Sequence, residues 1–338
     1  MITTKTITLQ LNDVWTLSRN SSRIKENVLV KIEKDGVVGY GEAAPNIRYG
    51  ENADLTDRMI RGASEVLFQC DLFHYTRVKE ILDELIVAQQ CAKAALDIAV
   101  MDWAAKSLKV PLYQMLGLDA EKTPVTSYSI GIDEIDIVKR KTELAADYPV
   151  LKIKVGSPND EAIIDAVRSV TDKPIRVDAN EGWTDKETAV RKIEWMRTRG
   201  VEFIEQPMPA AMLDETAWLR ERVDLPLVAD EAVMTAADIP ALAEVYDGIN
   251  IKLMKAGGIQ EAVTMIHAAR AAGLKVMLGC MIESSVAITA AAHLSPLADW
   301  ADLDGNLLIG NDPFRGVTVS HGRLILNDAP GIGVTGSW

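Results

Sequence analysis

The stretch LKIKVG, residues 151–156, places Lys152 and Lys154 two positions apart in an otherwise apolar segment. Successive side chains of a β-strand point to opposite faces, so the two lysines share one face and the apolar side chains share the other. Burying one ammonium group is costly, and burying two neighbouring ones is costlier. The stretch therefore predicts a buried strand whose lysine face meets compensating negative charge.

Short apolar segments of this kind recur at regular intervals along the chain, with helical patterns between them. Repeated strand-then-helix units indicate a parallel β/α barrel. The last segment lacks a clear helix and runs into the stretch GNDPFRG. The eight predicted strands lie at 125–132, 150–156, 174–180, 201–207, 226–231, 248–254, 275–280 and 300–306.

The regions on either side of this barrel have different patterns. The first ~70 residues alternate as in a strand meander, with a turn at Asp35-Gly36. Residues 75–118 switch to helical periodicity, and residues 314–338 return to strand and turn patterns. We expect two domains, an α+β capping domain at 1–118 completed by the tail 314–338, and a barrel domain with the active site at 119–313.

The inward side of the predicted barrel strands carries the charged residues. In a β/α barrel one face of each strand packs against helices, and the other faces the interior, which opens into the active site at the C-terminal strand ends. Lys255 has outward parity and begins a loop, so we expect it to be a surface charge. Strand alternation assigns to the interior Lys152, Lys154, Asp178, Glu205, Asp230, Asn250 and Lys252.

Three of these inward residues, Asp178, Glu205 and Asp230, are acids from consecutive strands and should meet at one mouth. Clustered carboxylates repel one another unless a cation joins them, and hard oxygen ligands suit Mg²⁺. The same acids compensate the charge of the lysine pair. Lys152 and Lys154, about 6.6 Å apart along the strand, should lower each other's pKa, so that a lysine can act as a base near neutral pH.

Five motifs follow one another along these strands: KIK (152–154), VDAN (177–180), IEQP (204–207), ADE (229–231) and NIKLMKAGG (250–258). In this order they resemble the enolase superfamily, specifically its muconate-lactonizing-enzyme subgroup. The similarity extends over nearly the whole chain. It implies a (β/α)7β modified TIM barrel with an α+β capping domain.

The resemblance also implies roles for individual residues. The shared chemistry is removal of a weakly acidic proton next to a carboxylate, and a metal ion and a lysine stabilise the enediolate that results. The implied roles are one Mg²⁺ bound by Asp178, Glu205 and Asp230, an acid/base pair of Lys154 and Lys252 on opposite faces of the substrate, and assistance to Lys154 from Lys152.

The stretch Asp302-Leu303-Asp304 resembles the Asp-x-Asp motif of dipeptide epimerases, which holds the free α-ammonium group of the first residue. Two carboxylates on one strand face make a site for a cation. The expected reaction is 1,1-proton transfer at the α-carbon of the second residue, with L-Ala-D/L-Glu from murein peptides as substrate and a possible wider L-Ala-L-Xaa range. Arg19 and Arg48 lie in loops that resemble the two capping loops, where one could pair with a substrate side-chain carboxylate. Ser127 has inward parity and is a further substrate-binding candidate.

Other readings of the same residues remain open. An o-succinylbenzoate synthase or N-acylamino-acid racemase of the same superfamily acts on substrates without a free ammonium, which leaves Asp302 and Asp304 without a partner. A Schiff-base lysine aldolase on a TIM barrel would use Lys154 covalently, and it leaves the three acids unexplained. A noncatalytic binding protein would need neither the lysine pair nor the acids.

Composition and charge exclude some classes of binding partner. The 338 residues are 48% hydrophobic and carry a net charge of −13, which argues against nucleic acid and anionic membranes as partners. The N-terminus reads as a strand rather than a signal peptide, and no apolar run reaches membrane-spanning length. Three widely spaced cysteines suggest no disulfide framework and fit the cytoplasm. We therefore expect a small dipeptide as partner and a cytoplasmic location, and leave a homo-oligomer open.

Overall fold

An eight-stranded parallel barrel forms the centre of the computed structural model, which describes residues 1–336. Neighbouring strands follow one another in chain order, and the Ser127 N–H donates to the Ala301 carbonyl (3.1 Å) where the first strand meets the last. All eight predicted strands are confirmed. They are β4 (Tyr128–Ile130), β5 (Leu151–Lys154), β6 (Ile175–Asp178), β7 (Val201–Glu205), β8 (Leu227–Ala229), β9 (Gly248–Lys252), β10 (Lys275–Gly279) and β11 (Trp300–Asp302).

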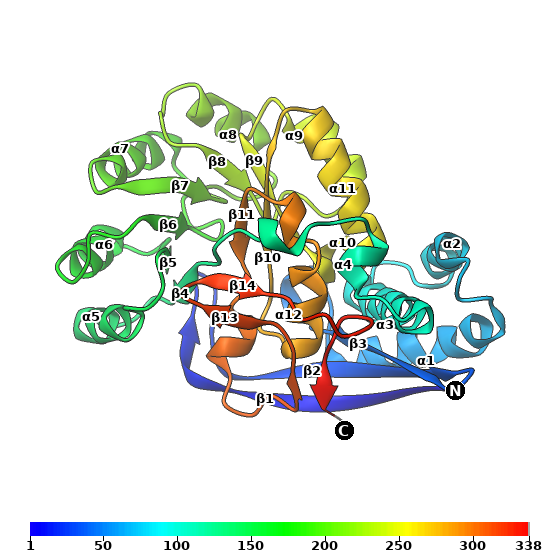
Figure 1. Ribbon diagram of the computed structural model, residues 1–338. Coiled ribbons are helices and arrows are strands. Elements are labelled where there is room, and N and C mark those ends of the chain that lie inside the picture. Colours follow the sequence, from blue (N-terminus) through cyan, green and yellow to red (C-terminus); the bar gives the residue numbers. More distant parts are fainter. Residues whose placement is uncertain (337–338) are drawn as a thin grey trace.

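Helices cover the outside of the barrel (Figure 1). Strand β11 is followed only by the short 3-10 turn η5 (Gly305–Leu308), so the eighth unit lacks its helix and the (β/α)7β expectation is confirmed. The barrel helices are α5 (Ile135–Leu144), α6 (Asp160–Arg168), α7 (Lys186–Arg197), α8 (Leu213–Arg220), α9 (Ile239–Leu242), α10 (Leu253–Ala256), α11 (Ile259–Ala271) and α12 (Ser285–Ala292).

Apolar side chains fill the barrel toward the N-terminal ends of its strands. Phe203, Val228 and Met277 are fully buried together, and Trp300 packs against them with its ring centroid 4.8 Å from that of Phe203. The Arg176 guanidinium lies over the Phe203 ring at 5.6 Å. This plug closes one end of the barrel, so the polar residues farther along the strands face a single opening.

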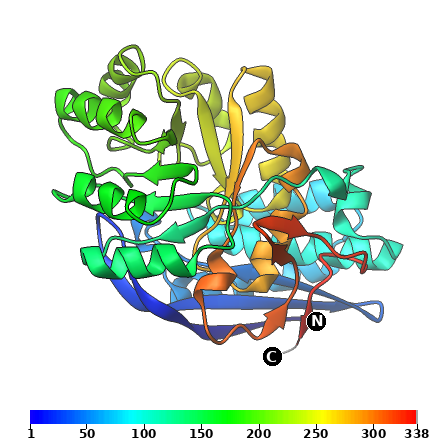
Figure 2. The same cartoon turned by 60° about the vertical axis from the view of Figure 1, so that its left-hand side comes forward.

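A three-stranded antiparallel sheet begins the chain and runs along the bottom of the molecule, with the barrel above it (Figures 1 and 2). Its strands are β1 (Ile2–Thr16), β2 (Ser21–Lys34) and β3 (Val37–Ala43). Asp35 and Gly36 both have positive φ, 52° and 75°, as a two-residue hairpin turn requires. The predicted meander and its turn are therefore confirmed.

The first helix, α1 (Ala53–Gln69), corrects the expectation that strands and turns continue to about residue 70. The Asn52 side chain accepts a hydrogen bond from the Leu55 N–H (2.9 Å), which caps the helix. The buried residues Ile60, Ala63 and Leu67 recur at helical spacing. Asn52 is the last residue of the polar stretch 45–52, and its role as the start signal of a helix was not recognised from the sequence. The other helices of the region are α2 (Tyr75–Leu85), α3 (Gln90–Leu108) and α4 (Leu112–Met115). Within residues 1–336, none of the helices combines the length and the apolar character that a membrane span requires.

Helix α3 packs unusually close to β3 because both contribute small residues. A Cβ atom added at Gly41 would lie 1.9 Å from the Ala95 carbonyl oxygen, and one at Gly39 would lie 2.2 Å from that of Ala99. The alanine-rich helix is buried along most of its length. Glycine on the strand and alanine on the helix therefore set the distance between the two elements.

Buried acids of the N-terminal region attach it to the barrel. Glu42 accepts hydrogen bonds from the N–H (2.9 Å) and Oγ (2.6 Å) of Ser284 at the start of α12. Asp97 accepts from the Ile259 N–H at the start of α11 (2.5 Å). Negative charge at helix N-termini is favourable because it meets unpaired N–H groups and the helix dipole. These contacts hold the capping strands over the barrel opening.

The C-terminal tail packs against the same region. Asp102 of α3 accepts a hydrogen bond from the Ile332 N–H (2.8 Å), and the rings of Tyr40 and Phe314 lie 5.2 Å apart. These contacts support our proposal that the tail completes the capping domain. The tail strands are β12 (Phe314–Arg315), β13 (Thr318–Ser320), β14 (Arg323–Ile325) and β15 (Thr335–Gly336).

The close packing of α3 against β3 leads to a stability prediction. Gly41→Ala should lower the free energy of unfolding by at least about 2 kcal/mol, because the new methyl group overlaps backbone atoms that cannot rotate away. Gly62→Ala is the matched control, since Gly62 lies in α1 with open space around its Cβ position, and alanine there should stabilise by up to about 1 kcal/mol. Urea unfolding measures both. An unchanged stability of Gly41→Ala would contradict the packing described.

Candidate active site

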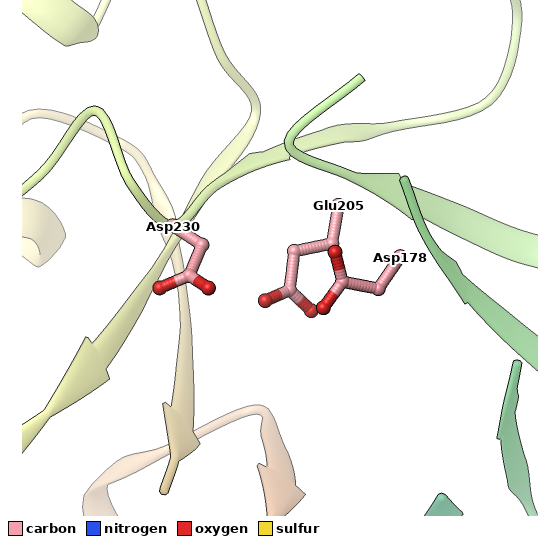
Figure 3. A group of neighbouring side chains, drawn as sticks. All are labelled: Asp178, Glu205 and Asp230. Carbon is pink, nitrogen blue, oxygen red and sulfur yellow. The ribbon is translucent and has the colours of Figure 1, made fainter. Parts of the chain in front are cut away.

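Three carboxylates meet at the open end of the barrel. Asp178 ends β6, Glu205 ends β7 and Asp230 follows β8, and one oxygen of each lies within 4.8 Å of the others. Their side chains extend from neighbouring strand ends toward a common point (Figure 3). Burial and the charge of Asp178 raise the pKa of Glu205 to about 8. Such a cluster of hard oxygen atoms can hold a divalent cation, which would offset the mutual repulsion.

The lysines predicted to point inward surround these acids. Lys152 Nζ lies 2.7 Å from Glu205 Oε2 and 3.2 Å from Asp178 Oδ2, and Lys154 Nζ lies 2.5 Å from Asp178 Oδ2. From β9, Lys252 Nζ lies 2.8 Å from Asp230 Oδ2. The lysine face of β5 therefore meets the negative charge that its burial requires.

The lysine pKa values run against the sequence-based expectation. Burial lowers the pKa of Lys152, but the charges of Asp302, Glu205 and Asp178 outweigh burial and raise it well above its usual range. Burial likewise lowers the pKa of Lys252, and Asp230 with Glu205 raises it above its usual range. The expected lowering is wrong for Lys152, because three carboxylates lie within 3.2 Å of its ammonium group.

Lys255 is a second correction, since it is buried rather than a surface charge. Its Nζ lies 2.6 Å from Asp230 Oδ1 and also donates to the backbone carbonyls of Asp230, Val233 (3.1 Å) and Asn250 (3.2 Å). Strand alternation does not reach Lys255, because β9 ends at Lys252 and α10 begins at Leu253. Lys255 thus holds one oxygen of Asp230 while Lys252 holds the other.

The backbone just beyond the strand ends adopts unusual conformations. Asn180, Glu181 and Gln206 have positive φ values of 43°, 67° and 36°, which cost free energy for residues other than glycine. The Gln206 side chain holds the next strand end, because its Oε1 accepts from the N–H groups of Asp230 (2.9 Å) and Ala232 (3.1 Å). Sequence reasoning assigned Gln206 no role, although its place directly after Glu205 was a usable signal.

The Asp302-Leu303-Asp304 stretch brings two more buried carboxylates to the site. Asp302 pairs with Lys152 (2.6 Å), and Asp304 accepts from the Ser129 N–H (2.6 Å). Burial and the neighbouring Asp302 raise the pKa of Asp304 to about 7. No cationic side chain among residues 1–336 forms an ion pair with Asp304. One carboxyl group at this end of the site is therefore available to a ligand.

Ser127 does not line the cavity described below. It is buried behind Asp302 and donates to Asp302 Oδ1 (2.6 Å), so it orients that carboxylate, whereas Ser129 of β4 reaches the cavity wall. The substrate contact of Ser127 stays a prediction, and the hydrogen bond to Asp302 gives this serine another role. Both serines have the same strand parity, but Ser129 lies two residues nearer the open end.

A central cavity lies between the capping strands and the barrel opening. The N-terminal region contributes Trp15, Leu17, Arg19, Lys25 and Tyr49 to its wall, and the barrel contributes the three lysines of β5 and β9 together with Asp302 and Asp304. An outer cavity adjoins it and includes Arg48 in its lining. The site therefore requires both parts of the chain.

The two candidate arginines are already paired with acids. Arg19 forms ion pairs with Glu181 (2.9 Å) and Glu231 (2.7 Å), and Arg48 pairs with Glu181 (2.8 Å). Glu181 thus joins the two capping loops to the loop that follows β6. The assignment of either arginine to a substrate carboxylate stays a prediction, and these contacts give both arginines another role.

The buried contacts of Lys255 generate a prediction. Lys255→Met should lower the free energy of unfolding by roughly 3 kcal/mol, because it removes a buried cation from beside the Asp230 carboxylate. Lys275→Met is the matched control, since Lys275 is exposed and pairs with Asp299 at 3.3 Å, and it should cost less than about 1 kcal/mol. Urea unfolding compares the two. Equal losses would mean that the buried contacts stabilise no more than an exposed pair.

Comparison with known proteins is in line with this geometry. The chain is 45% identical to the L-Ala-D/L-Glu epimerase of Bacteroides thetaiotaomicron, over 96% of this chain and 85% of that protein. The crystal structure of a dipeptide epimerase from Cytophaga hutchinsonii, complexed with Mg and the dipeptide D-Ala-L-Val, superimposes with a TM-score of 0.95 at 26% identity, covering 99% of this chain and 95% of that one. An N-succinyl Arg/Lys racemase from Bacillus cereus gives 0.94 at 29% identity, with coverage of 99% and 95%.

The two parts of the chain match two family descriptions. Residues 1–117 match the mandelate racemase / muconate lactonizing enzyme N-terminal domain, and residues 136–337 match the enolase C-terminal domain-like family. The resemblance inferred from the five motifs is confirmed. The chain belongs to the mandelate racemase / muconate lactonizing enzyme family of the enolase superfamily.

Proposed function

We propose that this protein is a Mg²⁺-dependent dipeptide epimerase that inverts the α-carbon of the second residue by 1,1-proton transfer. The observation that carries the proposal is the pair Lys154 and Lys252. Their strands, β5 and β9, are separated by three strands in either direction around the barrel, so the two amino groups approach the cavity from opposite sides. This is the arrangement that removal of a proton from one face of a carbon and its return to the other face requires.

Asp178, Glu205 and Asp230 would hold the Mg²⁺. Three buried carboxylates with an oxygen each inside a 4.8 Å cluster fit a small hard cation. A bound Mg²⁺ would supply positive charge beside the substrate carboxylate, which stabilises the negative charge that develops when the α-proton leaves. The Mg found in the Cytophaga hutchinsonii relative supports the same assignment.

Lys154 and Lys252 share the proton transfers. For one epimer, the α-proton passes to neutral Lys154 Nζ and a proton from the Lys252 ammonium is delivered to the opposite face of the same carbon. For the other epimer the roles are exchanged. Lys152, which contacts Asp178 and Glu205, assists by adding positive charge next to the reacting carboxylate.

The carboxylates of Asp302 and Asp304 fit the free ammonium group of the first residue. Both line the central cavity, and an ammonium group is the partner that the available carboxyl of Asp304 lacks. The Bacteroides thetaiotaomicron relative is an L-Ala-D/L-Glu epimerase. We therefore propose L-Ala-D/L-Glu, as released from murein peptides, as substrate, with activity on other L-Ala-L-Xaa dipeptides.

Racemisation of an N-acylated amino acid is the second candidate, favoured by the similarity to the N-succinyl Arg/Lys racemase. A substrate with an acylated nitrogen carries no ammonium group. It would leave the buried Asp304 carboxyl facing an amide, which makes this candidate the weaker of the two. In a Schiff-base aldolase, the cluster of Asp178, Glu205 and Asp230, which is typical of a metal site, would have no function.

We also propose a cytoplasmic location and a homo-oligomeric state. Cys70, Cys91 and Cys280 are free thiols, as proteins of reducing compartments usually have.

Exposed apolar side chains on and near α1 and α2, among them Phe68 and Val87, favour contact with a second copy of the chain.

The substrate proposal predicts the outcome of an assay in D₂O. L-Ala-L-Glu should gain one deuterium at the glutamate α-carbon, and a chelator should abolish the gain until Mg²⁺ is restored. N-acetylation of the dipeptide should lower kcat/KM at least about tenfold, because a charge-assisted hydrogen bond is lost. Mass spectrometry follows both.

Asp304→Asn is the control for this assay, since it should lower activity on the free dipeptide and make the enzyme nearly indifferent to N-acetylation. Equal activity of the unsubstituted enzyme on free and N-acetylated dipeptides would favour the racemase reading. Full activity in metal-free buffer would overturn the role of the acid cluster.

The division of labour between the lysines gives a separate prediction. Lys154→Met and Lys252→Met should each lower epimerisation by about a thousandfold, because a general acid/base is lost. Each variant should still exchange the α-proton of one epimer with deuterium, and the two variants should retain opposite epimers. Loss of exchange from both epimers in both variants would contradict the two-base assignment. Lys275→Met serves as an exposed control.

A further inference from the structure

Lys25 is the one cation lining the central cavity that has no anionic partner within residues 1–336. Five cationic side chains line that cavity, and four of them are paired with acids. Lys25 forms neither a salt bridge nor a side-chain hydrogen bond in the described part of the chain. The paired ones are Arg19 with Glu231, Lys152 with Asp302, Lys154 with Asp178 and Lys252 with Asp230.

The position of Lys25 on β2 directs its side chain toward the barrel. Asn27 is two residues farther along the same strand and shares this face. Asn27 is buried and donates to the Ile282 carbonyl (3.0 Å), which belongs to the segment after β10. Lys25 also lines the outer cavity, so it lies where the two cavities meet.

An ammonium group in this position is costly until an anion joins it. Partial burial lowers the pKa of Lys25, and no neighbouring acid opposes that effect. On the barrel side of the same cavity, the buried carboxyl of Asp304 lacks a cationic partner within residues 1–336. The central cavity therefore offers one unpaired cation and one unpaired acid, which suits a ligand that has an ammonium group at one end and an additional carboxylate at the other.

We infer that Lys25 binds the side-chain carboxylate of the second residue and selects dipeptides with an acidic residue there. The inference rests on the proposed function, in which the ammonium group of the dipeptide binds Asp304 and its α-carboxylate binds the metal held by the acid cluster. Arg19 and Arg48 keep their partners Glu181 and Glu231 and hold the capping loops. Lys25 is thus a specificity-determining residue, in place of the two arginines that the sequence suggested.

The test compares L-Ala-L-Glu with its neutral isostere L-Ala-L-Gln in the D₂O assay. The unsubstituted enzyme should prefer the glutamate dipeptide at least tenfold in kcat/KM, since a charge-assisted contact is worth about that much. Lys25→Met should remove this preference by slowing L-Ala-L-Glu at least tenfold while leaving L-Ala-L-Gln within about twofold. Lys25→Glu should prefer L-Ala-L-Lys over L-Ala-L-Glu.

The matched control is Lys31→Met, which removes a lysine from the same strand that lies outside both cavities and should change neither substrate. An equal loss on both dipeptides in Lys25→Met would assign Lys25 a structural role and overturn the inference. So would retention of the glutamate preference in Lys25→Met with its loss in Arg19→Met. Equal activity of the unsubstituted enzyme on both dipeptides would overturn the inference and leave dipeptide epimerisation intact. Absence of deuterium from every dipeptide would overturn the proposed function, and this inference with it.

Discussion

A buried carboxylate needs a positive charge beside it, and this requirement governs the centre of the protein. Three acids from neighbouring strands lie between the lysines of β5 and the lysine that ends β9, so that Asp178, Glu205 and Asp230 each lie near a buried ammonium group or share one. Lys152 forms ion pairs with both Asp302 and Glu205, and Asp230 forms ion pairs with both Lys252 and Lys255. Removing one member of such a network costs far more than breaking an exposed pair. The chemistry of the site and the stability of the barrel mouth therefore depend on the same contacts.

The sequence predicted the barrel because its strands are short, recur between helical patterns and, with the exception of Glu202, carry the site charges on the inward parity. The recurrence of apolar segments placed every strand, and the alternation of side chains placed each member of the acid cluster on the inward face. The reasoning worked as long as the chain remained in a strand. It failed at Lys255, three residues beyond the lysine of β9, because the backbone enters a helix at Leu253 and the Lys255 side chain points back to Asp230.

Other features depend on distances that no pattern states. Ser127 and Ser129 share a parity, and only the depth of the cavity separates the serine that orients Asp302 from the one that lines the wall. The direction of the lysine pKa values depends on whether carboxylates or ammonium groups lie closer. The pairing of Arg19 and Arg48 with Glu181 joins loops far apart in the chain. Such contacts follow from the assembled fold and have no local signal.

The attachment of Asp97 to α11 bears on how the chain can be divided. Gly258 precedes this helix and offers no side chain to its first N–H groups, and a Cβ there would overlap Asp97. The carboxylate that meets the N–H groups of Ile259 and Gln260 comes instead from α3, more than a hundred and fifty residues earlier in the chain. The N-terminus of this barrel helix is thus capped by a residue of the N-terminal region. An isolated barrel fragment would leave that helix end unsatisfied, so the barrel should be less stable when it is separated from α3.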